Sequence, residues 1–279
     1  MKFVRYGDAG REKPGMLDRE GRIRDLSAHL ADITGPAFED GSVARLADID
    51  PASLPLVEGS PRLGPCVGNV GAFHAIGLNY EDHARETNAP IPAEPILFSK
   101  ARSCIVGPYD DVVLPEGSVK SDWEVEIAFL IGKRAANVSR EEAPAHIAGY
   151  FVCNDVSERE FQLERGGGQW AKGKGCPTFG PIGPWLVTPD EIGDPQDLTL
   201  WLELNGERIQ NSTTRNMIFP FAELVSHLSR FLILEAGDIV TTGTPPGVGL
   251  GMKPERFLKR GDVMRLSVEG LGVQEQRVV

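Results

Sequence analysis

The sequence lacks the features that mark disulfide-stapled, zinc-ribbon and membrane proteins. It has four widely separated cysteines without any CxxC pair, so neither a disulfide framework nor a zinc ribbon is indicated: Cys66, Cys104, Cys153 and Cys176. No run approaches the roughly 18 apolar residues of a membrane-spanning helix, and the start carries no apolar stretch of signal-peptide length. We therefore expect a cytoplasmic protein that does not enter a membrane.

Positive charge is also scarce. The 279 residues include 29 Lys and Arg against 40 Asp and Glu, which gives a formal net charge of −11 and a pI near 5.0. This balance argues against a nucleic-acid partner or an anionic membrane surface, and a small anionic substrate would need local positive charge. Hydrophobic residues make up 41% of the chain, enough for a core.

The length favours one large domain and a small one. Residues 2–6 and 15–26 predict short strands with a turn at 18–21, followed by a helical patch over 26–33. Four prolines and two glycines between residues 51 and 65 favour an extended connection. We expect a small N-terminal α+β domain with a Pro-rich linker over residues 1–65 and a larger domain over residues 66–279.

An acid-bearing stretch, residues 122–131, organises the chain. Apolar residues alternate there with Asp122, Glu124 and Glu126, which predicts a β-strand with one apolar and one acidic face. Because like charges repel and carboxylates are rarely buried without a partner, the acidic face is either open to water, as on a solvated edge strand, or faces a cation. The apolar run that ends at Gly132 favours a strand buried in a sheet.

A second predicted strand, residues 149–155, ends in Asp155 just before a segment with helical character. Alone, Asp155 is equally well explained as a helix N-cap or an Asx turn. Together with Glu124 and Glu126 it completes an all-oxygen set suited to Mg²⁺ or Mn²⁺. Zinc is disfavoured because no cysteine or histidine joins this cluster in sequence.

Residues 73–86 predict a strand that breaks into a helix near Asn79. His83 and Glu86 share a helix face, so Glu86 can hydrogen-bond one imidazole nitrogen and aim the other at a water. This spacing predicts a general-base dyad, and the plainer alternative is an exposed polar pair. Asn79 and Tyr80 by themselves would be turn and packing residues.

Two glycine-rich segments are candidates for substrate contacts. Residues 157–168 carry Arg159 and Gln162 before a triple glycine, which predicts a polar helix that ends in a mobile loop. Lys172 and Lys174 follow, and a lysine beside a carboxylate-bound metal would stabilise an oxyanion or enolate; the alternative is a solvated basic loop. In residues 242–249 the backbone amides and the Thr244 hydroxyl are candidates to hold a carboxylate, the alternative being a surface turn.

Further elements follow from local patterns in the C-terminal third. Asn205-Gly206 predicts a type I′ hairpin turn. Apolar residues at helical spacing from Phe221 to Leu232, Phe231 included, predict a helix that faces the core. Residues 242–249 lack the GK[ST] ending of a P-loop, so nucleotide binding is not supported.

Together these motifs resemble the fumarylacetoacetate hydrolase superfamily over about residues 70–279. The resemblance rests on motifs in the family's order: Gly77-Leu78-Asn79-Tyr80 with His83 and Glu86, Glu124-Val125-Glu126, Asn154-Asp155, Arg159 with Gln162, Lys174 with Pro181, and Thr242 to Gly249. It implies an α+β protein with a mixed β-roll catalytic domain, usually a homodimer.

The resemblance also implies the roles of the site residues. It implies Mg²⁺, or Mn²⁺, held by Glu124, Glu126 and Asp155, and catalysis by Lys174 and by a His83–Glu86 dyad on a segment that orders over the substrate. Substrate contacts are implied for Asn79, Tyr80, Arg159, Gln162 and Thr244. Gly175-Cys176-Pro177 stand where members often carry Ser-Phe-Asp, which leaves open whether Lys174 or Lys172 points inward.

Within the superfamily, residues 166–175 and 185–188 resemble hydrolases of 2,4-diketo-3-deoxy sugar acids of the L-rhamnonate or L-fuconate type. That resemblance implies cleavage of the C3–C4 bond of a small anionic 2-oxo acid to pyruvate and a hydroxy acid such as lactate. The alternatives are an acylpyruvate hydrolase, or a hydratase, isomerase or decarboxylase of a related 2-oxo acid. A protein that binds its ligand without turnover is disfavoured, because simple binding needs no base.

Overall fold

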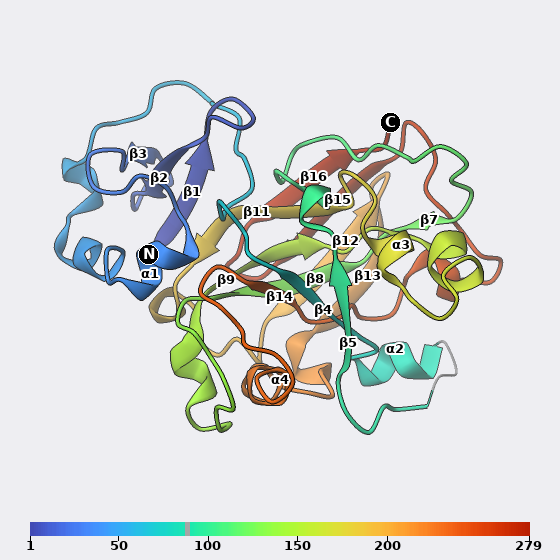
Figure 1. The fold of residues 1–279 in the computed structure, drawn as a ribbon. Coiled ribbons are helices and arrows are strands. Elements are labelled where there is room, and N and C mark those ends of the chain that lie inside the picture. Colours follow the sequence, from blue (N-terminus) through green and yellow to red (C-terminus); the bar gives the residue numbers. More distant parts are fainter. Residues whose placement is uncertain (87–89) are drawn as a thin grey trace.

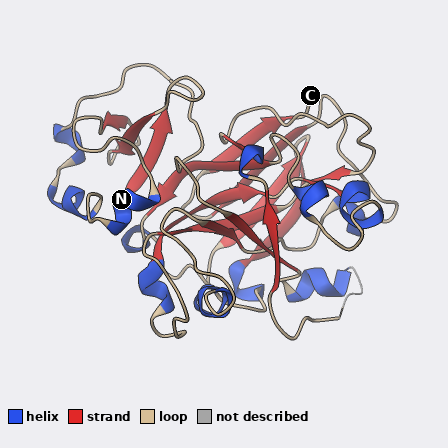
Figure 2. Ribbon diagram, viewed as in Figure 1, coloured by secondary structure: helices blue, strands red, loops and turns tan. Residues whose placement is uncertain are grey.

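The computed structural model describes residues 1–86 and 90–279 and is dominated by mixed β-sheets with few, short helices (Figures 1 and 2). Within these residues the long sheet has ten strands, nine of them in the order β3 (Ile23–Asp25), β2 (Lys13–Leu17), β1 (Lys2–Tyr6), β11 (Gly180–Val187), β9 (Ile147–Asn154), β8 (Val125–Ile131), β14 (Ile239–Thr241), β4 (Phe73–Gly77) and β5 (Ile96–Lys100). The tenth strand, β6 (Ile105–Val106), pairs with β11. The pairs β14–β4 and β11–β6 are parallel and the other neighbours in this sheet are antiparallel.

A four-stranded antiparallel sheet has the order β13 (Glu207–Thr213), β12 (Thr199–Leu204), β15 (Val263–Val268) and β16 (Val273–Arg277). A two-stranded sheet joins β10 (Ser157–Glu158) to β7 (Ser121–Asp122). The α-helices are α1 (Gly35–Glu39), α2 (Glu81–Glu86), α3 (Ala171–Lys174) and α4 (Phe221–Leu228), and η5 (Glu160–Glu164) is a π-helix. Short 3₁₀ turns are η1 (Ala44–Asp48), η2 (Pro51–Ser53), η3 (Arg102–Cys104), η4 (Ala143–His146), η6 (Pro189–Glu191), η7 (Thr214–Asn216) and η8 (Gly249–Gly251).

The N-terminal strands extend the long sheet at one edge (Figure 1). Strand β1 pairs with β11 through Lys2 opposite Val187 and Phe3 opposite Leu186. The helical patch predicted over residues 26–33 is wrong: these residues form turns, and the first helix is α1, which has a proline in its first turn. The domain boundary at residue 65 stays a prediction.

Strand β8 lies in the middle of the long sheet, and every one of its residues is buried. The four-stranded sheet packs against β8 and β9. Glutamines on that sheet satisfy backbone groups of the long one: Gln210 Oε1 accepts a hydrogen bond from Val125 N at 3.0 Å, and Gln274 Nε2 donates to Val152 O at 2.8 Å. The solvated edge strand considered for residues 122–131 is therefore wrong.

The strand predicted over residues 122–131 is interrupted at Trp123 and Glu124. Asp122 belongs to β7 and pairs with β10, whereas β8 begins at Val125. The Trp123 indole is buried and its Nε1 donates to Gly247 O at 2.9 Å. Because the chain changes sheets here, Asp122 leaves the alternation that the sequence pattern predicts.

The C-terminal third follows its sequence pattern closely. Strands β12 and β13 form the predicted hairpin, with φ of 54° at Asn205 and 83° at Gly206. Helix α4 ends at Leu228, so the prediction that Phe231 faces the core is wrong, and its side chain is 66% exposed. Among the residues that the structure describes, no helix has the length and apolarity to cross a membrane.

Candidate active site

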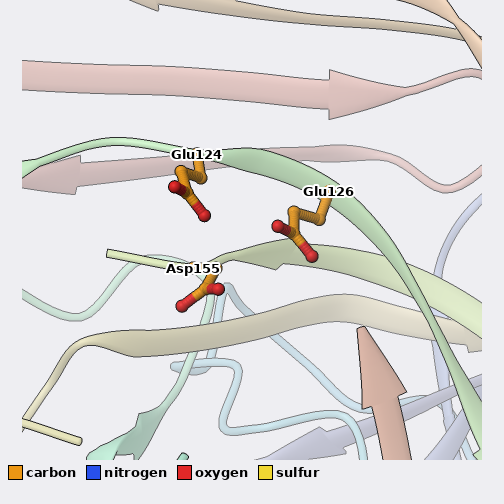
Figure 3. Close-up of side chains that lie close together, drawn as sticks. All are labelled: Glu124, Glu126 and Asp155. Carbon is orange, nitrogen blue, oxygen red and sulfur yellow. The ribbon is translucent and has the colours of Figure 1, made fainter. Parts of the chain in front are cut away.

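Three buried carboxylates converge at the paired ends of β8 and β9. Glu124 and Glu126 flank Val125, which lies opposite Asn154, and Asp155 follows directly. Figure 3 shows the three carboxyl groups pointing toward one another, and one oxygen from each lies within 4.8 Å of the others. All three residues are at most 6% exposed. The sequence predicts this set from acids at i and i+2 on one strand and a third acid at a neighbouring strand end.

Two cations neutralise part of this cluster. Lys174 Nζ lies 2.7 Å from Glu124 Oε2 and 2.8 Å from Asp155 Oδ2. Arg159 Nη2 lies 2.7 Å from Glu124 Oε1 and 2.8 Å from Asp122 Oδ2. Asp122 is further held by the backbone amide of Gly249, which donates to its Oδ1 at 2.7 Å. Asp122 therefore anchors Arg159 and does not join the three-carboxylate set.

The structure separates the two candidate lysines. Lys174 is 2% exposed and reaches the carboxylates from α3. Lys172 is exposed, and its Nζ donates to the backbone carbonyl of Arg165 at 2.6 Å. Of the two, Lys174 is the lysine at the acidic cluster.

A third cation, Lys100, is absent from the sequence prediction. It ends β5, its side chain is completely buried, and its Nζ lies 2.6 Å from Asp155 Oδ1. The same ammonium donates to Val156 O at 3.2 Å and to the backbone carbonyl of Lys174. The sequence signal that could have found Lys100 is strand alternation. Lys100 lies two residues after Phe98, so the two side chains share one face of β5.

The charges act unequally on the carboxyl groups. Burial alone would raise the pKa of Glu124, but the Lys174 ammonium and the Arg159 guanidinium outweigh burial and lower that pKa to about 2. Burial, followed by the negative charges of Asp155 and Glu124, holds the pKa of Glu126 well above its ordinary value. Lys174 and Arg159 thus offset the charge of Glu124 but not the repulsion and burial that act on Glu126.

These residues fit a divalent cation. Three buried carboxylates that point inward form the hard, all-oxygen donor set that Mg²⁺ and Mn²⁺ prefer. Glu126 Oε2 is oriented by Gly243 N at 2.9 Å and by the Thr241 hydroxyl. Oriented carboxylates of this kind are typical of metal sites, and the identity of the ion stays a prediction.

The predicted dyad is formed on α2, which follows β4. His83 Nδ1 lies 3.1 Å from Glu86 Oε2, and Glu86 Oε1 accepts a hydrogen bond from Gly247 N at 2.9 Å. Asp82, the neighbouring residue on α2, accepts a hydrogen bond from Ser212 Oγ at 3.0 Å. His83 is 8% exposed, so the alternative of an exposed polar pair does not describe it.

One cavity of about 180 Å³ brings these groups together. Its lining includes His83, Glu124, Glu126 and Lys174, together with three residues predicted to contact substrate, Arg159, Gln162 and Thr244. Gln162 Oε1 accepts from Arg159 Nη1 at 3.1 Å, and the Thr244 hydroxyl donates to Val125 O at 2.9 Å.

The structure does not bring Asn79 and Tyr80 to this cavity. Both are fully buried, and Asn79 Nδ2 donates to Thr242 O at 2.8 Å while its Oδ1 accepts from Phe219 N at 2.8 Å. Tyr80 forms a β-bridge with Met217. Their placement supports the alternative that the sequence left open, turn and packing residues, because they hold the β4–α2 turn in place.

Comparison with known proteins identifies relatives along the whole chain. The model of the fumarylacetoacetate (FAA) hydrolase C-terminal domain matches residues 72–279. A protein of Burkholderia cenocepacia strain HI2424 named "Putative hydrolase" is 59% identical over 99% of this chain and 98% of its own length.

Several solved structures are similar over 100% of this chain, and two of them show the range of activities. A fumarylacetoacetate hydrolase from psychrophilic Exiguobacterium antarcticum is 33% identical with a TM-score of 0.88, and the match covers 99% of that chain. A 2-hydroxyhepta-2,4-diene-1,7-dioate isomerase from Mycobacterium marinum is 29% identical with a TM-score of 0.74, and the match covers 98% of that chain.

Proposed function

The chain belongs to the fumarylacetoacetate hydrolase family, and we propose that it is a divalent-metal-dependent hydrolase that cleaves the C3–C4 bond of a 2,4-dioxo acid to release pyruvate. The observation that carries this proposal is one cavity lined by His83 of the His–Glu dyad, by Glu124 and Glu126 of the buried three-carboxylate cluster, and by Lys174. A dyad supplies a base for water, and the cluster supplies a site for a cation that binds an oxo acid.

The bound cation, held by Glu124, Glu126 and Asp155, would polarise the 2-oxo group of the substrate as a Lewis acid. The hydrogen bond between His83 Nδ1 and Glu86 fixes the imidazole tautomer and leaves Nε2 as the base. Nε2 takes a proton from water as the water oxygen bonds to C4.

The C3–C4 bond then breaks, and its electron pair goes to the pyruvate fragment as an enolate. The Lys174 ammonium, which is buried, offsets this negative charge. The proton that His83 took from water goes to C3, which gives pyruvate, and the former C4 leaves as a carboxylic acid that ionises to the carboxylate. Arg159 keeps Glu124 in place through its ion pair with Glu124, and a hydrogen bond from Nε to Asp122 fixes the guanidinium.

The substrate's tail is a separate question. The resemblance to sugar-acid hydrolases rests on residues 166–175 and 185–188, and of these Trp170 and Lys174 line the cavity whereas residues 185–188 do not. A 2,4-diketo-3-deoxy sugar acid and an acylpyruvate share the reacting dioxo head. Both therefore remain substrates within the proposed reaction.

A second candidate is isomerisation of a 2-oxo acid, because a structure of 29% identity carries the name of an isomerase. The same cation site and lysine would stabilise the dienolate of such a reaction, with His83 moving a proton between carbons. Isomerisation forms no pyruvate and consumes no water.

The test is product identification. With Mg²⁺, we expect pyruvate and a second acid from 2,4-dioxopentanoate or 2,4-diketo-3-deoxy-L-rhamnonate. NMR identifies both products, and a coupled assay with lactate dehydrogenase measures the pyruvate. His83→Ala should abolish both products, and Lys172→Met, a change at an exposed lysine, should not. Loss of substrate without pyruvate would refute hydrolysis and favour isomerisation.

The expected homodimer and cytoplasmic location stay proposals. Light scattering would test the first of them.

A further inference from the structure

An apolar wall lines the part of the cavity that the reaction above does not use. We define this wall as Phe98, Leu163, Trp170 and Leu250, all of which line the cavity. The rings of Phe98 and Trp170 meet edge to face, with centroids 5.1 Å apart and an interplanar angle of 63°. Leu163 is 48% exposed, which places this wall where the cavity opens to solvent.

The wall lies directly beside the reacting groups. Lys174 Nζ is 5.1 Å from the centroid of the Phe98 ring. Trp170 and Lys174 are one helical turn apart, since Lys174 N donates to Trp170 O at 3.2 Å. A dioxo head held at the carboxylates and Lys174 therefore directs the carbons beyond C4 toward Phe98 and Trp170.

The Trp170 ring lies against Gly77, where only a residue without a side chain leaves room for it. A Cβ added to Gly77, at the end of β4, would lie 2.5 Å from Cζ3 of Trp170, closer than such atoms approach. Gly77 has no positive φ, so its backbone accepts alanine. Gly77→Ala should therefore displace the far end of the Trp170 ring while keeping the aromatic side chain.

Two polar residues of the cavity, Thr244 and Arg159, are already engaged away from this wall. The Thr244 hydroxyl donates to Val125 O and accepts from Gln210 Nε2 at 2.9 Å. Arg159 is taken by Asp122, Glu124 and Gln162. A tail rich in hydroxyls would leave most of them without partners against the wall, which disfavours such a substrate.

Resting on the proposed function, we infer that the substrate's acyl tail is a short apolar chain packed against Trp170 and Phe98, and that Trp170 is a specificity-determining residue. The cavity holds about 180 Å³, against roughly 150 Å³ for a cavity that accommodates one benzene molecule, so the tail is a few carbons long. This tail differs from the hydroxylated one that the sugar-acid resemblance implies.

The experiment compares acids that differ only in tail. Hydrolysis is measured on 2,4-dioxopentanoate, on 2,4-dioxoheptanoate, which adds two methylenes, and on 2,4-diketo-3-deoxy-L-rhamnonate. Binding is measured by calorimetry with Mg²⁺ on 2-oxopentanoate and 2-oxoheptanoate, which lack the 4-oxo group and cannot be cleaved in this way. The proteins are wild type, Trp170→Ala, Gly77→Ala and, as a matched control, Trp201→Ala, whose ring packs under Arg208 on the four-stranded sheet.

We expect wild type and Trp201→Ala to favour the heptanoates by about tenfold or more in kcat/KM and in affinity, the usual worth of added methylenes in an apolar pocket. Trp170→Ala should reduce the preference for heptanoates over pentanoates to less than about threefold. Gly77→Ala should change this same preference while the protein stays folded. Affinity that rises with chain length in the absence of any pyruvate would refute the hydrolysis and retain the apolar tail site. Affinity and kcat/KM that are independent of chain length, a preference that survives in Trp170→Ala, or higher kcat/KM on the sugar acid would overturn the inference.

Discussion

Replacement of Lys100 by methionine tests how the buried charges hold the acidic cluster. Lys100 has three partners and no exposed side-chain surface: it forms an ion pair with the Asp155 carboxylate and donates to the backbone carbonyls of Val156 and Lys174. It thus fixes both the Asp155 carboxylate and the backbone from which the Lys174 side chain extends. Methionine keeps an unbranched side chain that is one atom shorter and removes all three interactions.

The magnitude follows from the burial. Removing one partner of a buried ion pair typically lowers the free energy of unfolding by about 3–5 kcal/mol. Asp155 keeps Lys174 within 2.8 Å, so we expect a loss near the lower value, about 3 kcal/mol. A protein with a typical stability of roughly 5–15 kcal/mol would remain folded. Loss of the group that orients a metal-binding carboxylate commonly weakens metal affinity about 10-fold to 100-fold.

Two measurements on metal-free protein check this. Urea unfolding gives the change in the free energy of unfolding, and calorimetry gives Mg²⁺ affinity at neutral pH. Lys172→Met is the matched control, since that lysine is exposed and donates to the backbone carbonyl of Arg165, and it should change stability by no more than about 0.5 kcal/mol. The reasoning is refuted if Lys100→Met binds Mg²⁺ as tightly as wild type, or more tightly through the lost positive charge, or unfolds like the control.

Three further outcomes are expected. Glu126→Ala should abolish Mg²⁺ binding in calorimetry, and unchanged affinity would exclude the carboxylate site. His83→Ala and Glu86→Gln should each lower kcat by about 100-fold or more, and the double variant should be little worse, whereas additive losses would show separate roles. Burial raises the pKa of Asp238, but hydrogen bonds from the backbone amides of Ala72 and Glu235, together with the His74 ring 3.8 Å away, outweigh burial and lower that pKa. The stabilisation by Asp238 is therefore present above the ordinary Asp pKa of about 3.9 and is lost as pH falls through the lowered pKa. Asp238→Ala should therefore cost about 1–3 kcal/mol in urea unfolding at pH 7 and less at pH 3, and an equal cost at both would contradict this origin.

Local sequence patterns predicted those elements whose conformation depends on neighbouring residues in the sequence. The turn at Asn205-Gly206 needs positive φ at two positions, and these residue types supply it in any context. The apolar run that ends at Gly132 likewise predicted the burial of β8, because a strand that is apolar on both faces must be covered on both. The end of α4 and the exposure of Phe231 were missed, since helical spacing continues past the residue where the chain leaves the core.

The sequence by itself determined the chemistry of the site: acids at i and i+2, a third acid at a strand end, and a histidine three residues before a glutamate. Those spacings survive folding because strands and helices have fixed periods. Only the tertiary structure decided which charges meet them. Lys174 rather than Lys172 reaches the carboxylates, Lys100 arrives from a strand 55 residues before Asp155, and Asn79 turns away to the backbone of residues 219 and 242. These contacts depend on which distant strands become neighbours, and no local pattern contains that information.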